Sequence, residues 1–224
     1  CNNSLMEEEE EKKTTPLSPE ELNGGAFDVD WFKDAYSKLG DKMFQKLYKA
    51  AKYISDGSKH SRARKYADAA TGLVDRDELE KTINDKRNQD LLMSYGIIPI
   101  KDEADEIHRY EYIQKFRKES KKFGSQRRAS EGNACDMSLK NMATVAGYSD
   151  SLRLILAMET AIVLSNQRFF DGITVGEYNF GVAIGDQGKA ELTITKDGKK
   201  IKSVPAALKK DENVVEIKDF ISKL

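Results

Sequence analysis

The sequence predicts an α+β fold that is predominantly α-helical: antiparallel helix hairpins, arranged as a solenoid or a bundle, followed by a small antiparallel β-meander and a C-terminal helix. Two observations support this fold. Across residues 27–170, apolar side chains recur at helical spacing in segments separated by glycines and capping residues. Across residues 173–204, apolar and polar residues alternate, with turn signals at 185–188 and at Asp197-Gly198.

Three regions follow from this pattern. Residues 1–26 hold a run of five glutamates, two prolines and few apolar residues, and we expect them to be a disordered acidic tail or linker. Residues 27–170 form the helical domain. Residues 171–224 form a three-stranded β-meander plus a C-terminal helix, packed on the helical domain.

Four helices are expected before an extended segment at 97–100, where Pro99 requires an extended residue before it. Glycines or capping residues bound these helices. No fixed sequence period is present, so a repeat architecture rests on helix pairing alone. The expected helices cover 30–39, 41–54, 58–71 and 75–95, and Gly96 ends the last of them.

The central stretch 109–168 organises the chain. On a helical wheel, the apolar stripe of residues 112–123 continues past Gly124 with a slow drift, which favours one long kinked helix. The alternative is that Gly124 and Ser125 end one helix and begin the next. A second apolar helix, opened by Ser149, is expected to fold back on the first.

Three charged residues fall on these apolar faces and form a predicted polar seam. Arg127 and Glu131 lie four residues apart, so they can meet on one helix, and Glu159 lies on the apolar face of the next helix. A buried charge must be paired, so we expect Arg127 to be buried against Glu131 or Glu159. Such a pair fixes helix register; the alternative is a polar site that faces a ligand or partner.

A basic face is expected on the central helix, because residues 115–128 contain seven bases and one acid. Such a run is most often a solvated surface, and the alternative is a surface that binds polyanions such as nucleic acid. Aromatic side chains of this helix point inward, so binding would be directed to the phosphate backbone. The candidate residues are Lys115, Arg117, Lys118, Lys121, Lys122 and Arg128.

In the meander, apolar residues of successive strands line one face of the sheet. The expected strands carry Tyr178 to Ile184, then Leu192 and Ile194, then Ile201 and Val204. So small a sheet needs a helix on one face. The helix that begins at Asp211 is the nearest candidate.

The sequence contains no glycine-rich phosphate loop, Walker lysine, GxSxG or HExxH motif. Two histidines and two distant cysteines do not have the spacing of a zinc site or a disulfide framework. We therefore expect no catalytic residue, no metal and no cofactor. No apolar run approaches the length needed to cross a bilayer. An enzyme that uses Arg127, Glu131 and Glu159 in a polar pocket is a third alternative.

Three segments resemble one known family, that of large bacterial proteins similar to the molybdate metabolism regulator, which carry a domain of unknown function. They are Asp30-Trp31-Phe32 through AAKYISDGSKHSRARKYADAATG; KFGSQRRASEGNA with NMATVAGYSDSLRLILAME; and GDQGKAELTITKDGKKIKSVPAALKKDENV. The match covers roughly residues 27–218 and departs at Gly132 and Asn133, where better helix formers are expected.

The resemblance implies a fragment, or a short relative, of a multidomain scaffold or regulator with helical repeats, some members of which also carry a WGR-type module. It brings no established catalytic residues. It also implies a cytoplasmic location and protein partners or further domains of a longer chain. The alternative location follows from Cys1, which suits a processed lipoprotein anchored through that residue.

Overall fold

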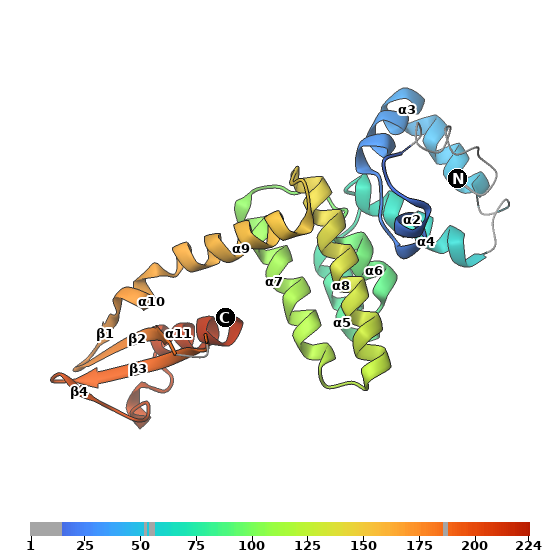
Figure 1. The fold of residues 1–224 in the computed structure, drawn as a ribbon. Helices are drawn as coiled ribbons and strands as arrows, with labels where there is room; N and C mark the ends of the chain where they lie inside the picture. The colour runs from blue at the N-terminus through green and yellow to red at the C-terminus, as the bar shows by residue number, and fades with distance from the viewer. Residues whose placement is uncertain (1–14, 52, 54–56, 186–187) are drawn as a thin grey trace. The chain divides into compact units, whose positions relative to one another are not determined.

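The computed structural model describes residues 15–51, 53, 57–185 and 188–224 (Figure 1). It confirms a mainly helical chain that ends in an antiparallel sheet and a C-terminal helix. The chain divides into two compact units, Cys1–Met158 and Glu159–Leu224, so the division lies inside the helix α9 (Ser151–Ser165) and not after residue 170. The elements are α2 (Pro19–Gly24), α3 (Val29–Ala51), α4 (Gly57–Ala70), α5 (Arg76–Lys86), α6 (Gln89–Tyr95), α7 (Glu103–Ser120), α8 (Ser125–Ala146), α9 (Ser151–Ser165), α10 (Gln167–Asp171), β1 (Ile173–Val175), β2 (Tyr178–Ile184), β3 (Ala190–Lys196), β4 (Lys199–Lys200), a 3-10 helix (Ala206–Leu208) and α11 (Glu212–Lys223).

The expected continuous helix through Gly124 is wrong, because α7 and α8 form an antiparallel hairpin (Figure 1). Gly124 has extended backbone angles of φ −60° and ψ 161° and immediately precedes α8, so the chain reverses there. The two halves of the apolar stripe therefore pack against each other. Gly132 and Asn133, by contrast, lie inside α8 without breaking it.

The fourth expected helix is two helices. Arg87 ends α5 with a left-handed backbone, at φ 48°, and the side chain of Asn88 accepts a hydrogen bond from Leu91 N to begin α6. A left-handed residue other than glycine is uncommon and ends a helix sharply. The break places the Arg87 side chain against α7 and α8.

Helix α6 packs against α8 in the core of the N-terminal unit. Gly96 ends α6 as expected, but with φ −63° it does not use the left-handed backbone of many C-terminal glycines. Its role is steric, since a Cβ at this position would overlap the carbonyl oxygen of Ser138. The Ser138 hydroxyl also donates to the Leu92 carbonyl at 2.7 Å, which ties the two helices together.

Residues 15–26 differ from the expected disordered tail. Ser18 and Glu21 form a reciprocal capping box at the start of α2, and Glu21 also pairs with Lys140 of α8. The side chain of Asn141 reaches the Gly25 carbonyl at 3.1 Å, and Ala26 is buried. The segment is therefore part of the N-terminal unit. Residues 1–14 of the expected tail lie outside the described residues.

Arg109 is the largest side chain that is completely buried. Its guanidinium donates to the carbonyl oxygens of Ile98 at 2.7 Å and Tyr95 at 2.6 Å. Burial lowers the pKa of Arg109 to about 10. The side chain thus fixes the extended crossing between α6 and α7, a role that the expected helical pattern did not reveal.

The C-terminal unit contains a four-stranded sheet in the order β1-β2-β3-β4, not the expected three strands. The extra strand arises because Gly176, at φ 61°, allows a tight turn between β1 and β2. Helix α11 covers the sheet as expected and buries Val214, Ile217 and Phe220. Strand β4 pairs only with Thr195 and Lys196, so no described strand pairs with the outer edge of residues 190–193.

Candidate polyanion site at the α7–α8 turn

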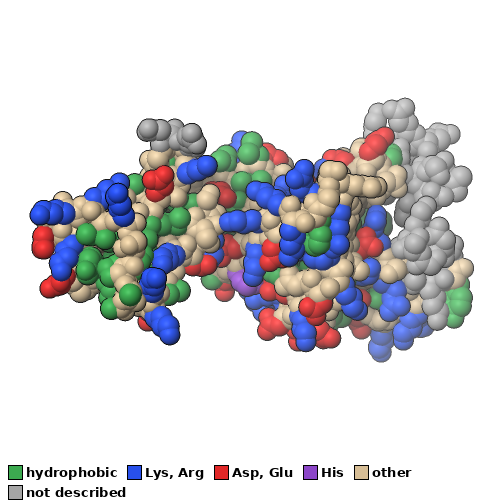
Figure 2. All heavy atoms as spheres, turned by 90° about the horizontal axis from the view of Figure 1, so that it is seen from below, with side chains coloured by type: hydrophobic (Ala, Val, Ile, Leu, Met, Phe, Trp, Pro, Cys, Tyr) green, Lys and Arg blue, Asp and Glu red, His purple; other side chains and the backbone are tan. Residues whose placement is uncertain are grey.

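The hairpin brings most of the predicted basic face to one end of the N-terminal unit. We call residues 118–128, from the last turn of α7 to the first turn of α8, the hairpin tip. Lys118, Lys121, Lys122 and Arg128 are exposed there, and Lys115 is exposed further along α7. Figure 2 views the molecule from below, the side toward which the tip points in Figure 1, and Lys and Arg side chains gather around it.

Arg117 is the predicted member that does not belong to the basic face. Its side chain is half-buried and its Nη2 lies 2.5 Å from Asp136 Oδ1 of α8. This ion pair bridges the two helices of the hairpin. Arg117 is therefore assigned a structural role, because its charge is already balanced by a neighbour.

Arg127 contacts Glu131 as predicted, with Nε 2.9 Å from Oε1. The predicted burial of Arg127 is wrong, since 48% of its side chain is exposed. The guanidinium lies over the Phe123 ring, 3.7 Å from its centroid. Arg127 is thus held on two sides while its outer surface faces solvent.

The buried cation of the seam is Arg87, which sequence reasoning missed. Its Nη2 lies 2.5 Å from Glu131 Oε2 and its Nη1 lies 3.0 Å from Glu119 Oε2. Nη2 also donates to the Phe116 carbonyl at 3.0 Å, and the guanidinium lies over the Phe116 ring at 3.4 Å. We call Arg87, Glu119, Glu131 and Arg127 the clasp, because they join α5, α7 and α8.

Glu131 is 1% exposed and receives two cations. Burial by itself would raise the pKa of this carboxyl, but the hydrogen bonds and charges of Arg87 and Arg127 outweigh it, so the pKa is lowered. Glu131 is therefore ionised at neutral pH. Its ionisation keeps both arginines in place.

Glu159 does not join the seam. Its side chain is exposed, so the expected burial of this carboxylate on the apolar face of α9 is wrong. The buried side chains of α9 are Leu154, Met158 and Ile162. The helix therefore turns a different face inward than the wheel suggested.

The tip carries a cationic surplus after its ion pairs are taken into account. Glu119 and Glu131 are both engaged by the clasp. Within the described part of the chain, Lys121, Lys122 and Arg128 form no ion pair. Such a surplus on one end of a rigid hairpin creates a positive potential that attracts anions.

Other chemistry is less well supported. Over the described ranges, no group of three or more His, Cys, Asp or Glu side chains is arranged to hold a metal ion. The same residues include no helix long and apolar enough to cross a bilayer. Cys135 is a buried free cysteine in α8, 3.9 Å from the Ile113 carbonyl oxygen. Burial raises the pKa of its thiol to about 11.

We expect Cys135 to resist thiol reagents in the folded protein. The thiolate is the reactive form, and the raised pKa keeps the Cys135 thiol neutral at pH 7. The neutral thiol stabilises the folded state below the ordinary thiol pKa, and this contribution is lost as pH rises toward about 11. In a Cys1→Ser variant at neutral pH, labelling should be slow in buffer and fast in denaturant. Fast labelling in buffer would contradict the burial of Cys135.

Fold and site together define a mainly helical domain with an appended sheet unit and a cationic hairpin tip. Residues 3–158 match the family of unknown function DUF5724, and the chain therefore belongs to that family. No curated protein and no solved structure matches the chain. The family match ends at residue 158, where the N-terminal unit also ends, so the matched segment coincides with that unit.

Proposed function

We propose that the chain is a non-enzymatic scaffold or interaction module within a larger cytoplasmic bacterial regulatory protein. The observation that carries this proposal is a set of large apolar side chains exposed on α3. Kinship with proteins similar to the molybdate metabolism regulator is part of the proposal and is supported by the three quoted segments. It implies no direct role in molybdate handling.

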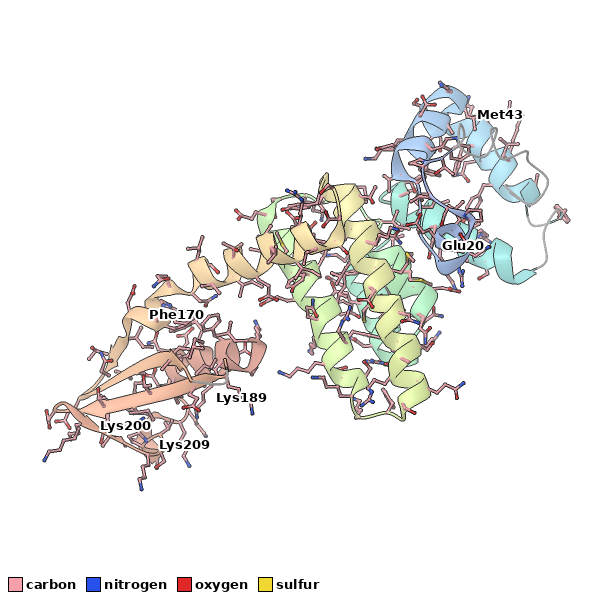
Figure 3. The ribbon with its side chains drawn as sticks, viewed as in Figure 1. Glu20, Met43, Phe170, Lys189, Lys200 and Lys209 are labelled. Carbon is pink, nitrogen blue, oxygen red and sulfur yellow. The ribbon has the colours of Figure 1, made fainter. Side chains whose placement is uncertain are left out.

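Helix α3 exposes several large apolar side chains that could contact a protein partner. Gly40, with φ 69° and ψ 160°, breaks it into two halves that pack through aromatic rings, and the Tyr36 and Phe44 centroids lie 4.9 Å apart. Outside this aromatic layer, Met43 (labelled in Figure 3) and Leu47 lie four residues apart, which places them on one helical face. The exposed apolar residues of α3 are Trp31, Leu39, Met43 and Leu47, each 41–50% exposed. Exposed apolar side chains that share one face, as Met43 and Leu47 do, favour a protein contact there.

The test is affinity capture of partners by the full chain from the native organism. We expect Leu39→Ser/Met43→Ser/Leu47→Ser to lose the captured partner while the free energy of unfolding changes by less than about 0.5 kcal/mol per site. Leu73→Ser is the control, because Leu73 is 73% exposed in the loop before α5. Equal capture by wild type and the triple variant would refute this role of α3.

The hairpin tip supports a second candidate function, the binding of polyanions. The supporting observation is that, in the described structure, three side chains are exposed and form no ion pair: Lys121, Lys122 and Arg128. Binding of this kind is electrostatic and independent of sequence, so its affinity falls steeply with salt. Fluorescence anisotropy of a labelled DNA duplex at about 50 and 200 mM salt tests it, and no binding at low salt would refute it.

A further inference from the structure

We propose that Arg127 is the anchoring phosphate-binding residue of the hairpin tip, and that its ligand is the phosphodiester backbone of double-stranded nucleic acid. This inference rests on the second candidate function and specifies its ligand. Lys121, Lys122 and Arg128 flank the anchor and supply the surrounding positive charge.

Arg127 is oriented before any ligand arrives. Nε donates to Glu131 at 2.9 Å, and Cζ of the guanidinium lies over the Phe123 ring, 3.7 Å from its centroid. Among the described residues, nothing accepts a hydrogen bond from the terminal nitrogens Nη1 and Nη2, and about half of the side chain is exposed. A guanidinium held through Nε presents its other donors as a fork, the geometry that binds phosphate oxygens in pairs.

The clasp explains why this orientation is stable. Arg87 fixes Glu131 through a 2.5 Å contact, and the buried Glu131 then fixes Arg127. A flexible surface arginine loses rotamer freedom when it binds, whereas Arg127 has already lost most of it. Arg87 is therefore a positioning residue and Arg127 is the contacting one.

The surroundings of the tip favour a duplex backbone over bases. Arg127 covers Phe123 at 3.7 Å, and Arg87 and Lys122 lie 5.5 and 5.6 Å from the same centroid. The ring is thus occupied by cations and cannot stack a base, which single-strand binders require. A backbone that presents phosphates at regular spacing suits the tip better.

The same region is poorly suited to a membrane surface. Membrane-binding helices place large apolar side chains outside to enter the lipid. Across residues 103–146, all of which are described, no large hydrophobic side chain is among the exposed ones. The apolar surface of α7 and α8 is directed into the core.

The experiment measures fluorescence anisotropy of a labelled DNA duplex at about 50 and 200 mM salt. We compare wild type with Arg127→Lys, Arg127→Met and Lys121→Glu/Lys122→Glu. The matched control is Lys209→Glu/Lys210→Glu, which reverses an adjacent and exposed lysine pair in the C-terminal unit, where Figure 3 labels Lys209. A single strand of the same sequence and vesicles with anionic lipid serve as competing ligands.

We expect wild type and the control to bind the duplex at low salt and the Lys121/Lys122 reversal to abolish binding. Arg127→Lys keeps the charge but loses the fork, and should bind about fivefold more weakly. Arg127→Met should also reduce the slope of log affinity against log salt by about one, a readout that a purely structural role would not change. Thermal unfolding checks that the two Arg127 variants and the two lysine reversals remain folded.

The outcomes distinguish polyanion binding by the hairpin tip from the role of Arg127 as its anchoring residue. No binding by wild type at low salt would overturn the polyanion function and the inference together. Loss of binding in the lysine reversal, with Arg127→Met equal to wild type, would leave the polyanion function standing and overturn Arg127 as its anchor. Tighter binding of the single strand or of the vesicles would overturn the duplex backbone as the ligand.

Discussion

Gly96→Ala is expected to lower the free energy of unfolding of the N-terminal unit by about 3 kcal/mol or more. The added Cβ would overlap the Ser138 carbonyl oxygen and lie 3.0 Å from the Ser138 carbonyl carbon, both backbone atoms of a long helix. Neither atom can rotate away, so α6 and α8 must separate. Overpacking usually costs about 1–3 kcal/mol, and a clash with rigid backbone lies at or above the upper end of that range. Separation also weakens the hydrogen bond from Ser138 to Leu92.

Gly132→Ala is the matched control for this prediction. Gly132 lies inside α8, and a Cβ there would meet no atom within 4 Å. Alanine is the better helix former, so this variant should be more stable by about 0.5–1 kcal/mol. Urea unfolding followed by circular dichroism, with Cys135 labelling as a local probe, distinguishes the two. Similar midpoints for both variants would show that the close approach at Gly96 is not rigid.

Arg87→Met is expected to lower the free energy of unfolding by about 3–5 kcal/mol, because it leaves Glu131 buried with a single partially exposed cation. It also removes the contact with Glu119 and the hydrogen bond to the Phe116 carbonyl. Arg127→Met removes the exposed partner of the same carboxylate and should cost less than about 1 kcal/mol. Equal losses in the two variants would contradict the assignment of Arg87 as the buried member.

The pH dependence of stability provides an independent check on the clasp. The pKa of Glu131 is lowered in the folded protein, so its ionised form contributes stability above the ordinary glutamate pKa. That contribution is lost as pH falls through the lowered folded value. Denaturant midpoints measured from neutral to acidic pH should therefore fall less in Arg87→Met than in wild type.

The parts of the fold that depend on local chemistry could be predicted from the sequence. The mainly helical class, the break at Gly40 and the end of a helix at Gly96 follow from periodicity and from glycine. The contact between Arg127 and Glu131 follows from their spacing of four on one helix. Each of these features is determined by residues that are close in the chain.

The features that were missed depend on residues far apart in the chain. A helical wheel continues through Gly124 whether the chain runs on or reverses, so the wheel could not reveal the hairpin. Arg87 and Glu131 are 44 residues apart, and no spacing rule connects them. The helix break at 87–88 did have a local signal, because Asn88 is a favourable N-cap.

The α2 helix also had an unused signal. Ser18 and Glu21 have the spacing of a capping box, with a proline at the first helical position. The acidic composition of residues 1–26 favours disorder and masks that signal. A short helix with few apolar residues is stabilised here by tertiary partners, among them Lys140.

The unpaired outer edge of β3 has a consequence for association between copies of the chain. An exposed strand edge is a template for another strand, and two such edges can join their sheets and begin aggregation. Around this edge the chain places four exposed lysines, at positions 189, 199, 200 and 202, whereas Lys196 is paired with Glu177. Edge-to-edge pairing of two copies would bring these like charges together. The lysines of this segment therefore act against self-association of the C-terminal unit, where β4 is too short to cover the edge.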